Sequence, residues 1–267
     1  MKLKVILSLL AILLFNCEKK SENIFLQSGD IRIAQPRLES TNQFIDSSTY
    51  LTASLKLEGT KIYYTSNGAL PTQNDQEYTE PIQVKTPGVY KFKAIHPDWK
   101  ESDISEIVFY EKGIPIDSII WKSNPHQRYS GTGKFTLSNN KKGALNFQDP
   151  QWLGFDTIAR ASLYLDRPEF VNSLTIGYLS DPGSWIFPPE SVTVQSTSDG
   201  IIYKDKTVVL TPLDKGSPAT MKTIQVPIED VINELHIEVK NVSSIPQWHE
   251  GNGTKAWIFM DEWVLNK

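Results

Sequence analysis

From Ile31 onward the chain consists of short segments in which apolar and polar residues alternate, separated by Pro and Gly turns. Alternation with a period of two lets a strand bury one face, whereas an amphipathic helix needs a period near 3.6. No stretch of any length shows the helical period. The alternating segments are 50–57, 61–65, 88–95, 104–110, 160–165, 171–176, 191–195, 223–226, 234–239 and 257–265. The pattern therefore predicts an all-β protein.

The strand pattern lapses at Gly113-Ile-Pro-Ile-Asp117, where a proline interrupts it, and this stretch is the predicted domain boundary. A chain of 267 residues is long for one small domain and sufficient for two. We predict a small antiparallel sandwich over residues 30–112 and a second β domain over 113–267, whose strand number suits a jelly roll.

The N-terminus has the composition of an export signal over residues 1–16. Lys2 and Lys4 precede an apolar core, Val5 to Phe15, that is too short to span a bilayer. Cys17 follows directly and is the only cysteine. Leu14-Phe15-Asn16-Cys17 resembles the lipobox of bacterial lipoproteins, although a residue smaller than Asn usually precedes the cysteine. The resemblance implies lipidation of Cys17; the alternative is an ordinary signal peptide with an incidental cysteine.

Charge and composition narrow the function classes. The chain has 27 basic and 31 acidic residues, and removing Lys2 and Lys4 with the signal leaves 25 against 31, a net charge of −6. This balance is unlike the basic footprint of a nucleic-acid binder, so no nucleic-acid partner is expected. Residues 17–29 are polar and are predicted to be a tether between the lipid anchor and the first domain.

The first domain resembles a known family at Tyr63-Tyr-Thr-Ser-Asn67-Gly68-Ala-Leu-Pro71-Thr72 and Tyr78-Thr-Glu-Pro-Ile82. These residues resemble the chitobiase/β-hexosaminidase C-terminal-type domain, which is an immunoglobulin-like (Ig-like) β-sandwich. Asn67-Gly68 also adopts positive φ easily and predicts a tight hairpin. The motif is chiefly structural in that family, so we assign no site to it.

The second domain resembles the discoidin (coagulation factor 5/8 type C) domain appended to bacterial glycosidases. The resemblance rests on motifs at 137–143, 146–155, 184–189, 196–200, 248–251 and 257–262. It implies a discoidin-type β jelly roll, so the predicted fold is an Ig-like sandwich followed by that jelly roll.

Many discoidin-type domains hold a structural calcium ion through an Asp-Gly loop and a carboxylate on the last strand. Here Asn139-Asn140 stands in the loop and Glu262 matches the last-strand ligand. Calcium gains affinity from negatively charged oxygen ligands, so Asn139 should weaken the site or abolish it. The alternative for Asp261-Glu262 is a solvated edge pair, and strand alternation would place the two carboxylates on opposite faces.

Aromatic side chains near the C-terminus are the candidate ligand contacts. A sugar ring offers an apolar face and a rim of hydroxyl groups, which suits an aromatic ring beside hydrogen-bonding groups. Trp248 and His249 lie in a Pro- and Gly-flanked loop and are the leading candidates. Trp185 and Trp152 are further candidates, while the apolar run around Trp257 favours a core position for that residue.

The function implied is a non-catalytic carbohydrate-binding lipoprotein of the bacterial cell envelope. It would be exported, lipid-anchored, and able to hold glycan, with N-acetylhexosamine-containing glycans as the suggested class and glycosidases of the same system as partners. One alternative is an accessory part of a β-hexosaminidase-type glycoside hydrolase system. Asp261-Glu262 is superficially similar to the catalytic pair of those enzymes, but the barrel that would carry such a pair is missing. Another alternative is a protein-binding adhesion or spacer protein.

Overall fold

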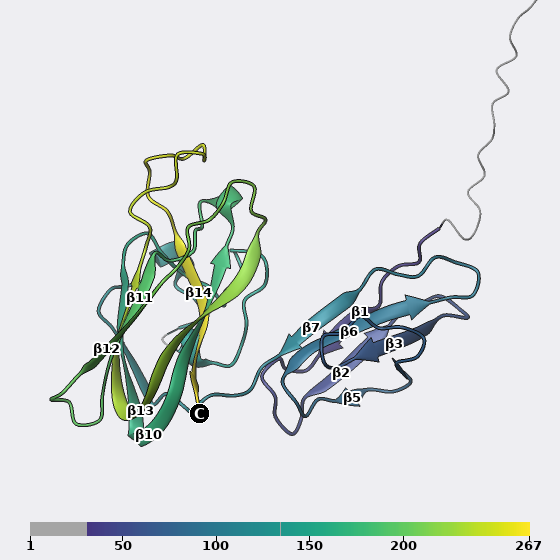
Figure 1. Ribbon diagram of the computed structural model, residues 1–267, viewed down its shortest axis with the longest axis horizontal. Helices are drawn as coiled ribbons and strands as arrows, with labels where there is room; N and C mark the ends of the chain where they lie inside the picture. The colour runs from purple at the N-terminus through teal and green to yellow at the C-terminus, as the bar shows by residue number, and fades with distance from the viewer. Residues whose placement is uncertain (1–30, 134) are drawn as a thin grey trace, which may run out of the picture.

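The computed structural model describes residues 31–133 and 135–267, which form two separate β units (Figure 1). The described residues contain no α-helix, only 3-10 turns, so the all-β prediction is confirmed. No helix in this described part is long and apolar enough to cross a membrane. The predicted signal at 1–16, the lipidation site Cys17 and the tether at 17–29 lie outside the described residues.

The first unit is a sandwich of two antiparallel sheets. One sheet has the order β1-β2-β5 and the other has the order β4-β3-β6-β7. The strands are β1 (Arg37–Ser40), β2 (Tyr50–Ser54), β3 (Lys61–Thr65), β4 (Gln76–Glu77), β5 (Ile82–Gln83), β6 (Gly88–Ile95) and β7 (Ser105–Phe109). Inward residues of these strands, together with Val84 directly after β5, form one core. Its members are Leu51, Ala53, Tyr64, Val84, Tyr90, Phe92 and Phe109.

The turn at Asn67-Gly68 is present, with Gly68 at φ 78°. It does not form a two-residue hairpin, because residues 66–75 all lie between β3 and its antiparallel neighbour β4. Gly68 N–H instead donates to the Val89 carbonyl at 2.9 Å, which ties the turn to β6.

The second unit contains the longer strands and the short 3-10 turns. Its strands are β8 (Ser118–Trp121), β9 (Leu153–Phe155), β10 (Ala159–Ser180), β11 (Ser191–Thr197), β12 (Lys204–Val209), β13 (Thr220–Lys240) and β14 (Ile258–Asn266). The 3-10 turns are η2 (Gln127–Tyr129), η3 (Thr136–Ser138) and η4 (Pro182–Ser184).

Two strands of this unit are longer than the sequence pattern predicts. The segments 160–165 and 171–176 are both parts of β10, and 223–226 and 234–239 are both parts of β13. The β10–β13 pairing shifts register between Tyr164 and Glu169, and Glu229 has φ 54°. The two strands therefore bend together, as bulges allow, and each contributes to both layers of the sandwich.

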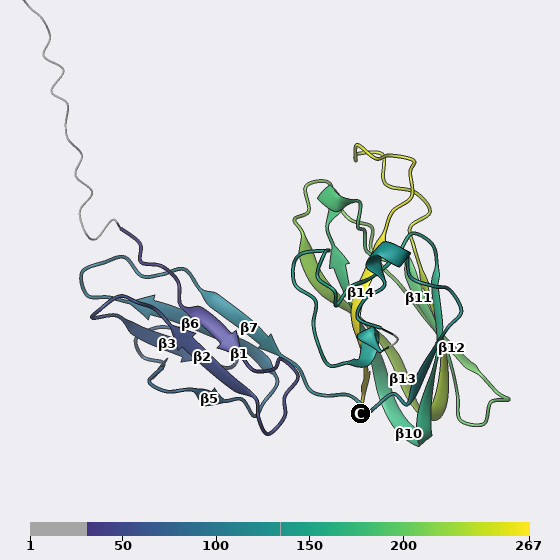
Figure 2. The ribbon, with the colours of Figure 1, turned by 180° about the vertical axis from the view of Figure 1, so that it is seen from behind.

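One layer consists of β8, the first half of β10, the second half of β13, β11 and β12. The other consists of the first half of β13, the second half of β10, β14 and β9. A continuous apolar core fills the space between them, including Leu163, Leu174, Ile237 and Trp263. Seen from behind, the teal connection from β8 to β9 covers β14 (Figure 2).

Candidate functional site

A hollow of about 240 Å³ lies in the second unit, between η2, η4 and the start of β14. Most of its lining is aromatic. The lining residues are Tyr129, Phe147, Ser184, Trp185, Ile186, Trp257 and Phe259. The Tyr129 ring centre lies 5.4 Å from that of Trp257 and 4.8 Å from that of Phe259, both edge to face. The rings therefore brace one another around an open concavity.

The two indoles of the hollow come from backbone segments that are joined directly. Trp257 N–H donates to the Trp185 carbonyl at 2.9 Å, and Phe187 N–H donates to the Trp257 carbonyl at 3.0 Å. Trp185 ends η4 in the left-handed region, at φ 59° and ψ 21°. That conformation is unfavourable for a bulky residue and costs roughly 1–3 kcal/mol, and such residues concentrate at functional sites.

The floor of the hollow is a buried apolar cluster of Trp152, Leu179, Ile186 and Phe259. Trp152 is 1% exposed, and its indole N–H donates to the Ala144 carbonyl at 2.9 Å. No face of Trp152 is open to a ligand, so its assignment as a ligand contact is corrected to a core position. Trp257 needs the opposite correction, because it is half-buried and lines the hollow rather than filling the core.

Polar groups stand beside the aromatic rings. The His126 imidazole lies edge to face with Trp257 at 5.1 Å, and the Arg128 guanidinium lies 5.6 Å from the centre of the Tyr129 ring. Both side chains are exposed. Ser184 adds a hydroxyl group to the lining. The hollow thus combines apolar ring faces with hydrogen-bonding groups at its edge.

Trp248 and His249, the leading sequence candidates, lie next to the hollow but do not line it. His249 Nε2–H donates to the Pro182 carbonyl at 2.8 Å, and His249 Nδ1 accepts from Gly251 N–H at 3.0 Å. Both ring nitrogens are therefore engaged: Nε2 joins the loop before β14 to η4, and Nδ1 closes a turn within that loop. Trp248 is half-buried against Phe187, with ring centres 6.2 Å apart. Trp185 is the original candidate that does line the hollow.

Asp261 and Glu262 are both buried, at 0% and 3% exposure, so the solvated-edge alternative is wrong for both. A register shift on β14 opposite β10, between Ile176 and Tyr178, explains why alternation fails. The Asp261 carboxylate accepts from Lys142 Nζ at 2.6 Å and from Gly143 N–H at 3.1 Å. Gly177 leaves the space for this pair, since a Cβ there would meet both charged groups.

Asn139 and Glu262 each keep one buried oxygen without a hydrogen-bond partner in the described chain, Oδ1 and Oε2 respectively. The other Glu262 oxygen accepts from Asn140 N–H at 2.8 Å. Burial raises the pKa of Glu262 to about 7, against the lowering effect of hydrogen bonds from the Asn140 and Lys141 backbone. Oxygen atoms of this kind are ligands that calcium prefers. The described residues hold no cluster of three or more His, Cys, Asp or Glu side chains suited to a metal.

Sequence reasoning missed Tyr129 and Phe147. Both lie in the polar connection between β8 and β9, and Phe147 is followed closely by Asp149-Pro150. The signal that drew attention to Trp248, an aromatic residue in a turn-rich loop, was therefore present for Phe147 as well. Their convergence with Trp185 and Trp257 depends on how the loops fold over the sandwich.

Comparison with known proteins identifies a family model for the first unit. Residues 41–106 match the family model of the chitobiase/beta-hexosaminidase C-terminal domain. That resemblance, predicted from Tyr63 to Ile82, is confirmed for the first unit. No curated protein matches the chain.

Several solved structures resemble the larger part of the chain. CpGH89CBM32-4 from Clostridium perfringens, in complex with GlcNAc-α-1,4-galactose, is 14% identical with a TM-score of 0.36, covering 57% of this chain and 90% of that chain. The C-terminal domain of a chitobiase from Bacteroides fragilis is 12% identical with a TM-score of 0.36, covering 58% and 97%. CpGH89CBM32-5 from Clostridium perfringens, in complex with GalNAc-β-1,3-galactose, is 14% identical with a TM-score of 0.36, covering 58% and 100%.

Proposed function

We propose that this protein is a non-catalytic carbohydrate-binding protein that holds glycan in the aromatic hollow of its second unit. The observation that carries the proposal is the pairing of Trp185, held at positive φ, with Trp257 on an adjoining backbone segment. Indole faces suit the C–H face of a sugar ring, and the edge groups His126, Arg128 and Ser184 suit its hydroxyls.

The size of the hollow sets the expected affinity and ligand. A volume of about 240 Å³ admits one or two sugar rings rather than a buried polymer. A shallow site of this kind binds at roughly micromolar to millimolar levels, so engagement of a polymeric glycan gains from repeated contacts. We propose N-acetylhexosamine-containing glycans as the ligand class.

Calorimetric titration of the mature chain with di-N-acetylchitobiose tests the proposal. Trp257→Ala should weaken binding by about tenfold or more, because stacking on one aromatic ring contributes on the order of 1 kcal/mol or more. Trp257→Phe should retain part of the affinity. Tyr50→Ala, which removes an exposed ring from the first unit, is the matched control. Equal affinities in Trp257→Ala and the control would overturn the placement of the site.

Hydrolysis is not part of the proposal, for a geometric reason. A glycosidase places two carboxyl groups on either side of the scissile bond. Asp261 is buried in its ion pair with Lys142, Glu262 is buried beside Asn140, and neither lines the aromatic hollow. Release of nitrophenol from an aryl N-acetylglucosaminide by the purified chain, at a rate that survives further purification, would contradict a purely binding role.

We also propose calcium as a structural ion held by Asn139 Oδ1 and Glu262 Oε2. The support is that these two buried oxygens have no partner in the described chain, and that calcium prefers oxygen ligands. The ion would neutralise the buried Glu262 carboxylate and hold the 139–143 loop against β14. Calcium should raise the thermal unfolding temperature of the wild type above that in EDTA, and Glu262→Gln should remove the increase.

For the N-terminus we propose export and lipid anchoring through Cys17 at the bacterial membrane. The sequence of residues 1–17 supports this anchor. We propose glycosidases that act on the same glycan as the partner proteins. Metabolic labelling with a radioactive fatty acid should mark the wild-type chain and not Cys17→Ala. Equal labelling, or release of the wild type in soluble form, would contradict the anchor.

A further inference from the structure

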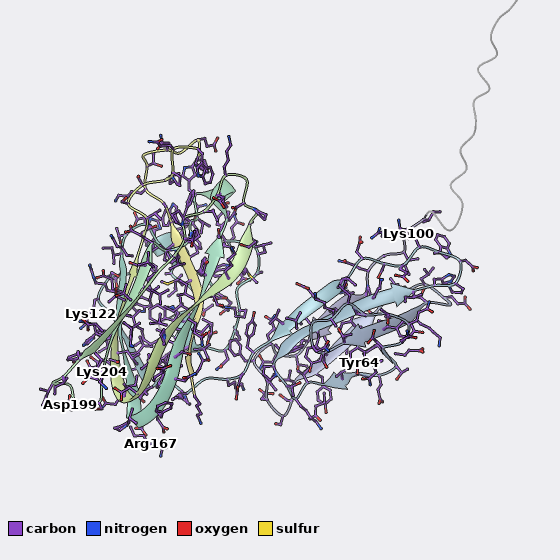
Figure 3. The ribbon with its side chains drawn as sticks, viewed as in Figure 1. Tyr64, Lys100, Lys122, Arg167, Asp199 and Lys204 are labelled. Atoms are coloured by element: carbon purple, nitrogen blue, oxygen red, sulfur yellow. The ribbon has the colours of Figure 1, made fainter. Side chains whose placement is uncertain are left out.

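A second hollow, of about 370 Å³, lies on the outer face of the five-stranded layer and shares no residue with the aromatic hollow. No Trp, Tyr or Phe side chain lines it. Its lining residues are Lys122, Arg160, Ala161, Ser162, Thr193, Gln195, His236, Ile237 and Glu238. Figure 3 labels Lys122 on this flank of the second unit. This set favours charged and hydroxyl-bearing ligands over apolar ones.

Strand register fixes the order of these side chains. Arg160 lies opposite Glu238, which lies opposite Thr193 on the next strand. On the other side, Lys122 N–H donates to the Arg160 carbonyl at 2.8 Å, which places Lys122 beside Arg160. Two cations thus lie next to each other, an arrangement that is unfavourable across paired strands without a compensating anion.

The single carboxylate in the lining does not satisfy both cations. Glu238 Oε2 accepts from Arg160 Nε at 2.7 Å, which leaves the terminal guanidinium nitrogens available. Lys122 is exposed and forms no ion pair with any described residue. A carboxylate between Lys122 Nζ and the terminal guanidinium nitrogens of Arg160 would neutralise the excess positive charge. Arg pairs with carboxylates through two parallel hydrogen bonds.

Besides Lys122, Arg160 and Glu238, the hollow is lined by the apolar Ala161 and Ile237 and by four polar side chains. Ser162 Oγ lies 2.7 Å from His236 Nδ1, and His236 Nε2 lies 3.2 Å from Glu234 Oε1. These two contacts hold the His236 imidazole in place at the side of the hollow. Gln195 Nε2 donates to Asp205 at 3.1 Å, which leaves its Oε1 free to accept from a hydroxyl. A hollow of this size exceeds what a small inorganic anion needs and lies within the range of pockets for organic ligands.

We infer that this face is a second binding site, for a sugar that carries a carboxylate. The uronate carboxylate would lie between Lys122 and Arg160, and the ring hydroxyls would face Thr193 and Gln195. The site is independent of the aromatic hollow, so the two sites would let the chain hold glycans that contain both neutral and acidic sugars.

The experiment titrates trigalacturonate into the mature chain by calorimetry, at low and at high sodium chloride. We expect binding that weakens at high salt, because these charges are exposed and screened. Fully methyl-esterified trigalacturonate keeps the rings and removes the charge, and it should bind at least tenfold more weakly. Lys122→Gln and Arg160→Gln should each weaken trigalacturonate binding by about tenfold. Lys206→Gln, on the exposed β12, is the matched control and should have no effect.

This site would be overturned by absence of trigalacturonate binding, by equal affinity for the methyl ester, or by unchanged affinity in both cation variants. Trp257→Ala separates this inference from the proposed function, because it should leave trigalacturonate binding intact. Loss of trigalacturonate binding in Trp257→Ala alone would move the acidic sugar to the aromatic hollow and remove the second site.

Discussion

The loop at 245–257 and the strand β14 that follows it both contain aromatic and acidic residues, but bury them to different extents. The loop and its neighbours present half-buried rings around a hollow, whereas β14 buries two carboxylates, Asp261 and Glu262. On the loop, aromatic groups stay open because η4 and its hydrogen bonds to the loop support them from one side. On the strand, charges enter the core only where a cation or a backbone N–H meets them. The comparison teaches that the burial of a side chain here depends on the groups that contact it, and not on its residue type alone.

The largest expected effect concerns the buried ion pair of β14. Lys142→Met leaves the Asp261 carboxylate buried and unpaired, which should lower the free energy of unfolding by about 3–5 kcal/mol. Urea denaturation measures this. The double variant Lys142→Met/Asp261→Asn removes both charges and should recover part of the loss. A single variant as stable as the wild type would show that the strand does not depend on this pair.

The next effect is a pH dependence caused by Glu262. Its folded-state pKa, raised to about 7 from 4.5, means that the calcium-free native protein holds a proton that the unfolded chain releases. Stability in EDTA should therefore fall as the pH rises from about 4.5 to 7, by up to about 3 kcal/mol in total. Glu262→Gln should lack this component when the two unfolding curves are subtracted. If stability changed with pH in the same way in the wild type and in Glu262→Gln, the Glu262 carboxyl would be solvated rather than buried.

A smaller loss is expected at Gly177. A Cβ at this position would press on both the Asp261 carboxylate and the Lys142 ammonium. Gly177→Ala should cost about 1–3 kcal/mol, as overpacked cores do, and should also shift the Lys142–Asp261 contact. Gly253→Ala is an informative contrast, because nothing lies near a Cβ there and only its positive φ opposes the change. A Gly177→Ala variant as stable as the wild type would show that the Lys142–Asp261 pair does not need the space left by this glycine.

The smallest effect separates the loop from the hollow. Trp248 packs on Phe187 outside the hollow, so Trp248→Ala should change the affinity for di-N-acetylchitobiose by less than about threefold. Trp257→Ala should reduce it by tenfold or more. Calorimetry on the two variants side by side makes the comparison. A larger loss from Trp248→Ala would return the ligand contact to the loop residue first chosen from the sequence.

The sequence predicts the strands well because one-sided burial leaves a period of two, as in Arg160–Leu165 and Glu234–Val239. It does not predict that β10 and β13 run on through their bends. Three charged residues and a proline at Asp166–Glu169 interrupt the pattern, although the backbone stays in a strand. For a related reason the sequence predicts a ligand contact at Trp152 and a core position at Trp257, whereas the structure has the reverse. Both residues lie in apolar runs, and the fold of the connection between β8 and β9 decides which indole is covered.

The most direct test of the aromatic hollow is nuclear magnetic resonance of the indole N–H groups during titration with di-N-acetylchitobiose. The seven tryptophans give separable reporters at positions with different exposure. We expect the signals of Trp257 and Trp185 to shift in proportion to occupancy. The signals of Trp152, bonded to the Ala144 carbonyl, and of Trp99 in the first unit should stay in place. Shifts confined to Trp248, or no shift at saturating sugar, would contradict the site.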